Sequence, residues 1–436
     1  MADPDTGRRY QSRRAFLRRF GASVIGLSVG SGFGSPSVLG LTAQGMPITG
    51  PSVPGMQSFD RVIPSLMRKW DVPGGAVAVV KDERLVLARG YGLADQAQGS
   101  DVQPDALFRI ASVSKPITSV ATLQLVENGQ LSLDDKAFDI LNRFKPSGGV
   151  RDERVNDITV RMLLQHAGGW DIDELGYDPM FASTRIAEAE GTEPPADADT
   201  IIRFMLKRRL NFTPGTDYAY ANFGYCVLGR VIEEVTGQSY ETHVKASVLA
   251  PMGISRMQIG HTRKSQRVEG EVRYHGGNLV NSVFPNGGLV SRPYGGFYLE
   301  AMDAHGGWIA SSIDLMRFMT HVDGRASIAD ILEKGTLRTM TARPQVPHWQ
   351  GKDFYYAMGW TVRPQSENWW HTGSLPGTSS ILVRTGQRNR NLSWAALFNS
   401  RPDNWQKFNA EMDSALWEAV RNVSSWPDHD LFGRFP

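Results

Sequence analysis

Strand-like segments lie at the two ends of this chain, and a long helical stretch separates them. β-Branched and apolar residues fill 75–81 and 85–91, and the short polar segment between them predicts a hairpin. Helical periodicity dominates from 112 to 254. Strand-like runs then return at 355–362, 367–371, 378–384 and 392–398. This order predicts an α+β fold: an antiparallel sheet flanked by helices, built from both chain ends, with an inserted and mainly helical domain.

The expected helices frame this sheet and fill the middle of the chain. One begins the folded part at 58–70, one lies at 312–322, and one closes the chain at 404–423. The segment 171–199 is acidic and loop-like, and 258–300 is rich in Gly and polar residues, which predicts long loops. Within the helical stretch, amphipathic periodicity marks 117–127, 160–165, 201–210 and 223–235.

These patterns divide the chain into four parts. We interpret residues 1–45 as a targeting segment and the Pro- and Gly-rich residues 46–56 as a linker. The sheet-containing part of the folded domain then comprises 57–111 and 331–436, and the mainly helical part comprises 112–330.

The N-terminal segment is typical of a twin-arginine export signal. Arg13 and Arg14 precede the apolar pair Phe16 and Leu17, and a mild apolar stretch diluted by Gly and Ser follows. The alternative is a basic disordered tail. We expect export to the periplasm or the extracellular space, with a membrane tether only if the segment stays uncleaved.

Charge and cysteine content exclude several classes of site. The net charge is +2, of which residues 1–45 contribute +4, so the rest of the chain carries −2 and shows no general attraction to nucleic acid. Cys226 is the one cysteine and lies in an apolar run, so we expect a buried thiol and no disulfide. No His-Glu-x-x-His motif occurs, and the sequence predicts neither a metal nor a cofactor.

Ser112 and Lys115 form a Ser-x-x-Lys motif at the start of an expected helix. A spacing of three residues puts both side chains on one helical face, where the lysine can take the serine proton. That chemistry needs a neutral amine at working pH, which burial and neighbouring groups would have to favour. The alternative is a helix-capping serine beside a solvated lysine.

Two further motifs carry groups suited to a hydrolytic site. Tyr220 and Asn222 form the one Tyr-x-Asn of the chain; a phenol can relay a proton and an amide can orient the lysine, although Asn222 is equally placed to cap a helix. His371, Thr372 and Gly373 lie late in the chain between strand-like runs. The threonine offers a hydroxyl to a substrate, and the glycine allows close approach of a substrate backbone.

In this order, the three motifs resemble the serine β-lactamase and penicillin-binding-protein superfamily. The class C-like branch, which includes D-Ala-D-Ala carboxypeptidases, D-aminopeptidases and β-lactamase-like esterases, is most similar. The resemblance covers about residues 56–420, and further matching blocks lie at 108–112, 128–135, 163–169, 306–315 and 358–360.

The resemblance implies a role for each motif residue. Ser112 would be the acylated nucleophile, Lys115 its base, and Tyr220 the acid/base that serves the leaving group and the deacylating water. Asn222 would position Lys115 and the substrate. The segment His371, Thr372 and Gly373 would take the place of the family's Lys-Thr-Gly, and the backbone N–H groups of Ser112 and Ser374 would form the oxyanion hole.

One departure from the family pattern bears on the substrate. His371 stands where the family has a lysine that gives a fixed positive charge for carboxylates, so we expect weaker binding of β-lactams. The sequence therefore predicts a serine hydrolase that acts through a Ser112 acyl-enzyme on a small-molecule or peptide amide or ester. The alternatives are a β-lactamase and a non-catalytic penicillin-binding-like sensor module.

Overall fold

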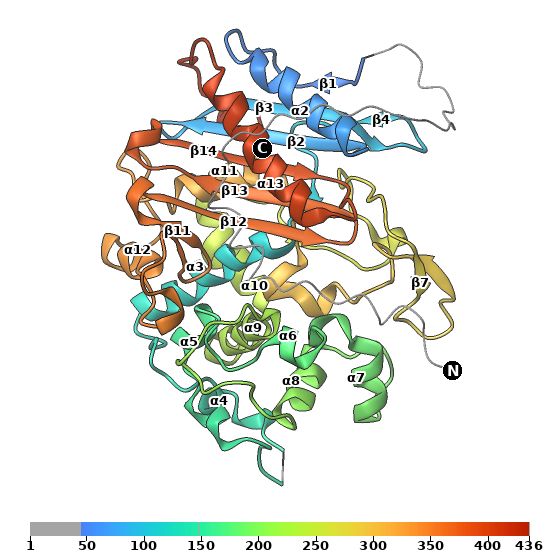
Figure 1. Ribbon diagram of the computed structural model, residues 1–436, viewed down its shortest axis with the longest axis vertical. Helices are drawn as coiled ribbons and strands as arrows, with labels where there is room; N and C mark the ends of the chain where they lie inside the picture. The colour runs from blue at the N-terminus through green and yellow to red at the C-terminus, as the bar shows by residue number, and fades with distance from the viewer. Residues whose placement is uncertain (1–44, 147, 436) are drawn as a thin grey trace.

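The computed structural model describes residues 45–146 and 148–435, and its centre is a nine-stranded antiparallel sheet (Figure 1). The strands follow the order β1-β3-β2-β14-β13-β12-β11-β10, with β4 paired to β3. Figure 1 shows strands from the two chain ends, coloured blue and orange-red, side by side in this sheet. The predicted α+β fold is confirmed. The strands are β1 (Ile48–Thr49), β2 (Gly74–Lys81), β3 (Arg84–Asp95), β4 (Ser100–Asp101), β10 (Tyr355–Tyr356), β11 (Thr361–Arg363), β12 (Asn368–Leu375), β13 (Thr378–Arg384) and β14 (Leu392–Phe398).

The pairing of β2 with β14 joins the two ends of the chain, with Val79 opposite Trp394. Both strands are almost wholly buried, which explains why their sequences are continuous apolar runs rather than alternating ones. The hairpin between β2 and β3 turns at Asp82 and Glu83, which both have positive φ, at 47° and 60°. A turn with two such residues matches the right-handed twist of the flanking strands.

Helices cover both faces of the sheet. On one face, α2 (Gln57–Lys69) and α13 (Trp405–Arg421) pack against each other and onto alternate side chains such as Val77 and Val79 (Figure 1). The opposite face, with Ala76 and Ala78, belongs to a larger core that it shares with the helical part of the chain. The sheet is therefore the middle layer of the molecule.

The helical part begins directly after the short strand β5 (Phe108–Arg109). This strand belongs to a three-stranded sheet in which β9 (Trp308–Ala310) pairs with both β5 and β6 (Gln258–Ile259). The segment expected to form long loops, 258–300, holds short elements, among them the hairpin of β7 (Leu279–Asn281) and β8 (Leu289–Ser291). The remaining helices are α3 (Ser114–Glu127), α4 (Ala137–Ile140), α5 (Val160–Leu164), α6 (Ile172–Leu175), α7 (Ser183–Glu190), α8 (Ala198–Leu206), α9 (Asn222–Thr236), α10 (Tyr240–Val244), α11 (Ser312–Thr320) and α12 (Lys334–Thr341).

Three expectations about local structure are wrong. The acidic segment 171–199 contains helices α6 and α7. Asp171 caps α6 by accepting from Asp173 N, and Asp178 caps the short turn before α7 by accepting from Met180 N. The expected strand 355–362 is two strands, β10 and β11, separated by a turn at Gly359 with φ 81°. The expected linker includes β1, which pairs with β3 at the sheet edge.

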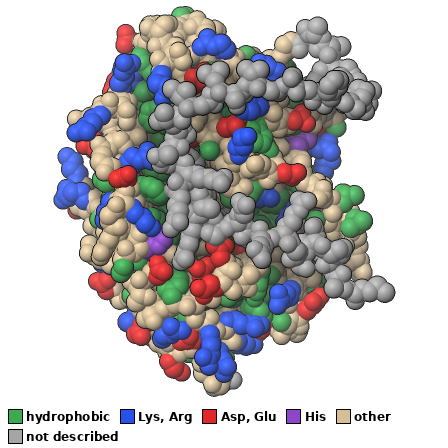
Figure 2. Space-filling model, in the orientation of Figure 1, with side chains coloured by type: hydrophobic (Ala, Val, Ile, Leu, Met, Phe, Trp, Pro, Cys, Tyr) green, Lys and Arg blue, Asp and Glu red, His purple; other side chains and the backbone are tan. Residues whose placement is uncertain are grey.

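The predicted export signal lies outside the described residues, apart from Gly45. In the part of the chain that the structure describes, no helix combines the length and apolar character needed to cross a bilayer. Acidic and basic side chains are interspersed over the described surface shown in Figure 2. The division of the chain into sheet-containing and helical parts stays a prediction.

The sheet holds the segment that carries Ser112. Thr378 Oγ1 donates to Arg109 O at 2.7 Å, and Ser380 Oγ donates to Ile110 O at 2.7 Å. Opposite Ser380 lies Gly373 of β12, and a Cβ added there would overlap both Ile110 O and Ser380 Oγ. The glycine of the motif therefore lets β12 lie against the nucleophile segment.

We predict that Gly373→Ala separates β12 from this segment. The added methyl group has no space, so we expect a loss of about 1–3 kcal/mol in the free energy of unfolding and a large loss of any Ser112-dependent activity. Thermal denaturation and a hydrolysis assay measure both effects. Gly433→Ala is the control, since nothing lies within 4 Å of a Cβ there. Equal stability and activity of the two variants would contradict this account.

Candidate active site

Ser112 lies in η1 (Ala111–Val113), a single tight turn between β5 and α3. The preceding residue, Ala111, has φ 49°, in the left-handed region that a non-glycine residue rarely adopts. Such a conformation persists only when its surroundings enforce it, and it is common at functional sites. The serine lines a cavity of about 830 Å³.

The cavity brings together residues that are far apart in the sequence. Besides Ser112, four of the predicted site residues line it: Tyr220, His371, Thr372 and Ser374. Lys115 and Asn222 lie buried behind the serine, and Gly373 packs against the serine's own segment. All eight predicted positions thus belong to one region of the fold.

Lys115 is fully buried and its amine has three hydrogen-bonding neighbours. Lys115 Nζ is bonded to Ser112 Oγ at 3.1 Å and donates to Asn222 Oδ1 at 2.8 Å and to His305 O at 3.0 Å. The two carbonyl oxygens can only accept, whereas the serine hydroxyl can donate or accept. These contacts fit a protonated amine that donates to all three oxygens, and equally a neutral amine that donates to both carbonyls and directs its lone pair at Ser112. The interpretation of Lys115 as a solvated side chain is wrong.

Asn222 is held in one orientation by an acidic residue that the sequence analysis missed. Asn222 Nδ2 donates to Asp178 Oδ2 at 2.6 Å, which turns the amide oxygen toward Lys115. Because a carboxylate accepts only, this bond excludes the flipped amide. Asn222 is the first residue of α9 and makes no capping bond, so its interpretation as a helix cap is wrong. The alternative of Ser112 as a helix-capping residue fails too, since the N-cap of α3 is Val113.

His166, which lies outside the three predicted motifs, packs against Tyr220 with ring centroids 4.3 Å apart. Its Nδ1 accepts from Ala221 N at 3.2 Å, and it has φ 57°. The ring therefore fixes the backbone between Tyr220 and Asn222. Lys115 Nζ lies 4.7 Å from the Tyr220 ring centroid, which puts the phenol beside the amine.

His371 is hydrogen-bonded through both ring nitrogens. Its Nδ1 lies 2.7 Å from Thr372 O, and because a carbonyl only accepts, this nitrogen carries a proton. Its Nε2 lies 3.1 Å from the hydroxyl of Tyr356. Burial raises the pKa of Tyr356 well above its usual value, so the phenol keeps its proton and can donate it to Nε2. A neutral imidazole satisfies both bonds.

A second histidine near the amine also stays neutral. His305 is fully buried in the turn η9 (Asp303–Gly307), and its carbonyl is one of the two acceptors of Lys115. Burial, and after it the neighbouring Lys115, lower the pKa of the His305 imidazole well below its usual range. The His305 ring is therefore neutral beside the amine.

Arg109 ties the 258–300 segment to the nucleophile. Its guanidinium donates to Pro293 O at 2.6 Å and His261 O at 2.7 Å, and it stacks 4.4 Å from the ring centroid of Tyr274. The side chain is 1% exposed, only three residues before Ser112. A buried guanidinium with these partners fixes the loops rigidly to the turn that carries the serine.

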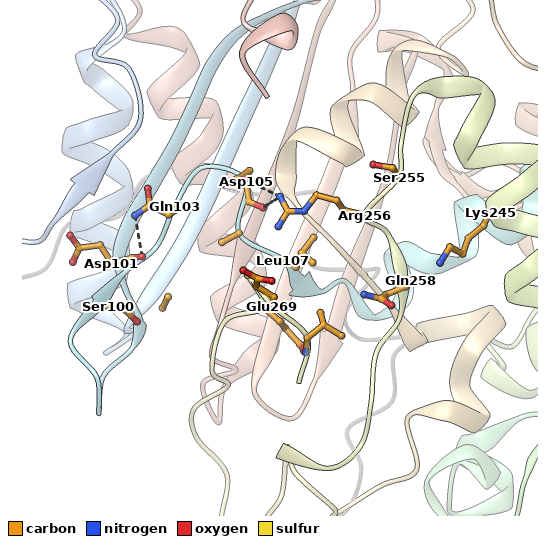
Figure 3. A pocket seen from close by; sticks show the side chains of 15 residues that line it. Ser100, Asp101, Gln103, Asp105, Leu107, Lys245, Ser255, Arg256, Gln258 and Glu269 are labelled. Carbon is orange, nitrogen blue, oxygen red and sulfur yellow. Dashed lines mark hydrogen bonds and ion pairs between the residues drawn. The ribbon is translucent and has the colours of Figure 1, made fainter. Parts of the chain in front are cut away.

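A second cavity, of about 770 Å³, shares no lining residue with the first (Figure 3). Its two basic side chains have acidic partners: Arg256 Nη1 donates to Asp105 Oδ2 at 2.8 Å, and Lys245 lies 3.8 Å from Glu241, which is outside the cavity lining. Within 45–146 and 148–435, no group of three or more His, Cys, Asp or Glu side chains is arranged to hold a metal ion. Cys226 is buried, as expected, and burial raises the pKa of its thiol.

The family model described as "Beta-lactamase" matches residues 59–416, so the chain belongs to the β-lactamase family. Protein flp of Staphylococcus aureus (strain N315) is 24% identical over 344 residues, 79% of this chain and 63% of that protein. The chain thus spans less than two thirds of this relative's length.

Two further similar proteins are named as hydrolases. Esterase EstB of Burkholderia gladioli is 32% identical over 201 residues, 45% of this chain and 49% of that protein. The D-amino acid amidase of Ochrobactrum anthropi SV3, solved with L-phenylalanine amide, has a TM-score of 0.64 and 22% identity, covering 85% of this chain and 99% of its own. The latter likeness shows a shared fold.

We predict that Asp178→Ala lowers kcat of the hydrolase by about 10- to 100-fold, because Asn222 loses a bond to a charged acceptor and can turn away from Lys115. Asp178→Asn keeps an oxygen that accepts from Asn222 and should recover part of the loss. The matched control is Asp197→Ala, which removes a helix-capping carboxylate from Thr200 N, away from the cavity. Equal kcat values for the alanine variant and this control would contradict the positioning role.

Proposed function

We propose that this protein is a serine hydrolase that forms an acyl-enzyme on Ser112 with uncharged esters and amides. The observation that carries the proposal is the amine of Lys115, buried and bonded to two carbonyl oxygens with its remaining position facing Ser112 Oγ. Nothing in ligand binding alone requires a buried amine at that position. Membership of the β-lactamase family and the esterase and amidase among its relatives support the same reaction class.

In the first half of the proposed reaction, Lys115 Nζ accepts the proton of Ser112 as Oγ attacks the substrate carbonyl. The backbone N–H groups of Ser112 and Ser374 stabilise the oxyanion, and each such donor contributes roughly 3 kcal/mol. Tyr220 protonates the leaving alcohol or amine. In the second half, water attacks the acyl-enzyme and gives one proton to Tyr220, which had lost its own to the leaving group. Lys115 returns the first proton to Ser112 Oγ as the acyl bond to Oγ breaks.

The hydrogen bonds of His371 support an uncharged substrate. A neutral imidazole satisfies both of them, with Nδ1 donating to Thr372 O and Nε2 accepting from Tyr356. Two basic and three acidic side chains also line the cavity, which leaves it without a net attraction for anions: Lys352, Arg363, Asp171, Asp173 and Asp353. A substrate carboxylate next to the reacting bond would therefore lack the positively charged partner that a lysine at position 371 would provide.

β-Lactam hydrolysis is the second candidate, favoured by the family to which the chain belongs. A sensor that binds such compounds without turnover is a further alternative. We also propose export by the twin-arginine route and a place in the periplasm or outside the cell, where small esters or peptides are the expected substrates. We propose no nucleic-acid partner.

The proposal predicts the effect of His371→Lys on selectivity. With two esters that differ only by a carboxylate near the acyl carbonyl, the wild-type protein should hydrolyse the uncharged ester with the higher kcat/KM. The lysine variant should shift this ratio toward the carboxylate by about tenfold or more, because a charge-assisted hydrogen bond replaces a neutral one. Its acylation by a penicillin should also become faster.

Ser112→Ala is the control for this series and should lose hydrolysis of both esters. A wild-type preference for the carboxylate, or an unchanged ratio in the lysine variant, would contradict the assignment of an uncharged substrate. Full physiological function of the alanine variant would favour the sensor instead.

A further inference from the structure

The cavity beside Ser112 continues around the free edge of one strand. β11 pairs with β12 only up to Trp370. Beyond Trp370, no other described strand pairs with this edge of β12. Trp369 belongs to the core on the helical side of the sheet, whereas Trp370 packs into the cluster of α2 and α13. Because side chains alternate along a strand, Thr372 and Ser374 point to the same side as Trp370, toward α13.

On that side, α13 contributes two residues to the cavity, Trp405 and Asn409. Asn409 is 1% exposed, and its Oδ1 is buried without a hydrogen-bond partner among the described residues. Ser374 Oγ is likewise buried and unpartnered in that part of the chain. A buried amide oxygen without a donor is costly and rare, so a group with a donor is missing from this compartment.

The hydrogen-bonding groups of the compartment restrict the chemical class of the missing donor. A carboxylate has no proton to give to Asn409 Oδ1, so it leaves the amide oxygen unsatisfied. An ammonium ion would supply donors, but it offers no acceptor to the amide N–H groups of Asn409. A secondary amide supplies both a donor and an acceptor. The carboxamide of Asn409 pairs naturally with a second amide, whose N–H and C=O complement its own acceptor and donor.

We propose that this compartment, formed by Ser374, Trp405 and Asn409, is a specificity site that binds a secondary amide group of the substrate, away from the bond that is cleaved. The inference rests on the proposed function, since it assigns a second contact to the substrate of Ser112. Trp405 gives the amide an apolar wall, and Asn409 Oδ1 accepts its N–H. The preferred substrates are then peptide-like: an ester or amide at Ser112 that carries another amide in the same molecule.

The test uses three esters with the same reacting group and a distal segment of equal length. One carries a secondary amide there, the second an ester in its place, and the third only methylenes. We expect wild-type kcat/KM for the amide-bearing substrate to exceed that for its distal-ester analogue by about tenfold. Asn409→Leu, which is close in volume, should reduce this ratio to about one. Asn409→Asp keeps an acceptor and should retain a preference for the amide.

Gln406→Leu is the matched control, because Gln406 lies on the same helix but does not line the cavity. This variant should keep the wild-type ratio. Equal kcat/KM values of the wild-type protein for all three esters overturn the proposal, as does a preference that survives in Asn409→Leu. Should that variant not fold, the wild-type ratio alone decides. Failure of the wild-type protein to hydrolyse any of the three would instead count against the proposed function.

Discussion

The amine of Lys115 joins three segments that lie far apart in the sequence. It bonds to Ser112 in the turn before α3, to Asn222 at the start of α9, and to the carbonyl of His305 in η9. The bonds to Asn222 and to the carbonyl of His305 are buried, where an unsatisfied amine would be costly, and the bond to Ser112 is partly buried at the cavity. The packing of these three segments and the chemistry of the serine therefore depend on the same few contacts.

The sheet and its attachments hold this arrangement in place. Hydroxyl groups of β13 bind the backbone before Ser112, and Gly373 lets β12 lie against it. Arg109 then links the same segment to the 258–300 loops. A nucleophile fixed from both sides loses little freedom on meeting a substrate, which is the condition for efficient attack. Asp178 adds one further hydrogen bond, which it accepts from the amide of Asn222 and which holds that amide in place.

The sequence predicts the strands and longer helices well, because their periodicity is local. The runs at 378–384 and 392–398 coincide with β13 and β14, and the helix expected at 223–235 is α9. Short elements are predicted less well for an equally local reason: an aspartate cap begins α6, and an acidic composition is also typical of a loop. The motif residues were found because each motif is contiguous.

The residues that contact and orient the motif side chains could not be predicted from contiguous sequence motifs. Asp178 lies 44 residues from Asn222, and Tyr356 lies 15 residues from His371 in a different strand. His166 packs on Tyr220 across 54 positions of sequence, and Asn409 lines the cavity from α13, which packs on one face of the sheet. These contacts arise from tertiary packing, for which a single sequence carries no periodic signal.

The central claim is that the buried amine of Lys115 activates Ser112 toward an acyl group. It is tested most directly by mixing the protein with an activated uncharged ester, quenching in acid within milliseconds, and recording the intact mass. We predict a burst that adds one acyl group, located on Ser112 by peptide mapping, and its loss in Lys115→Met, which conserves volume without a basic group. Acylation of Lys115→Met at the wild-type rate, or an acyl group on another residue, would contradict the account.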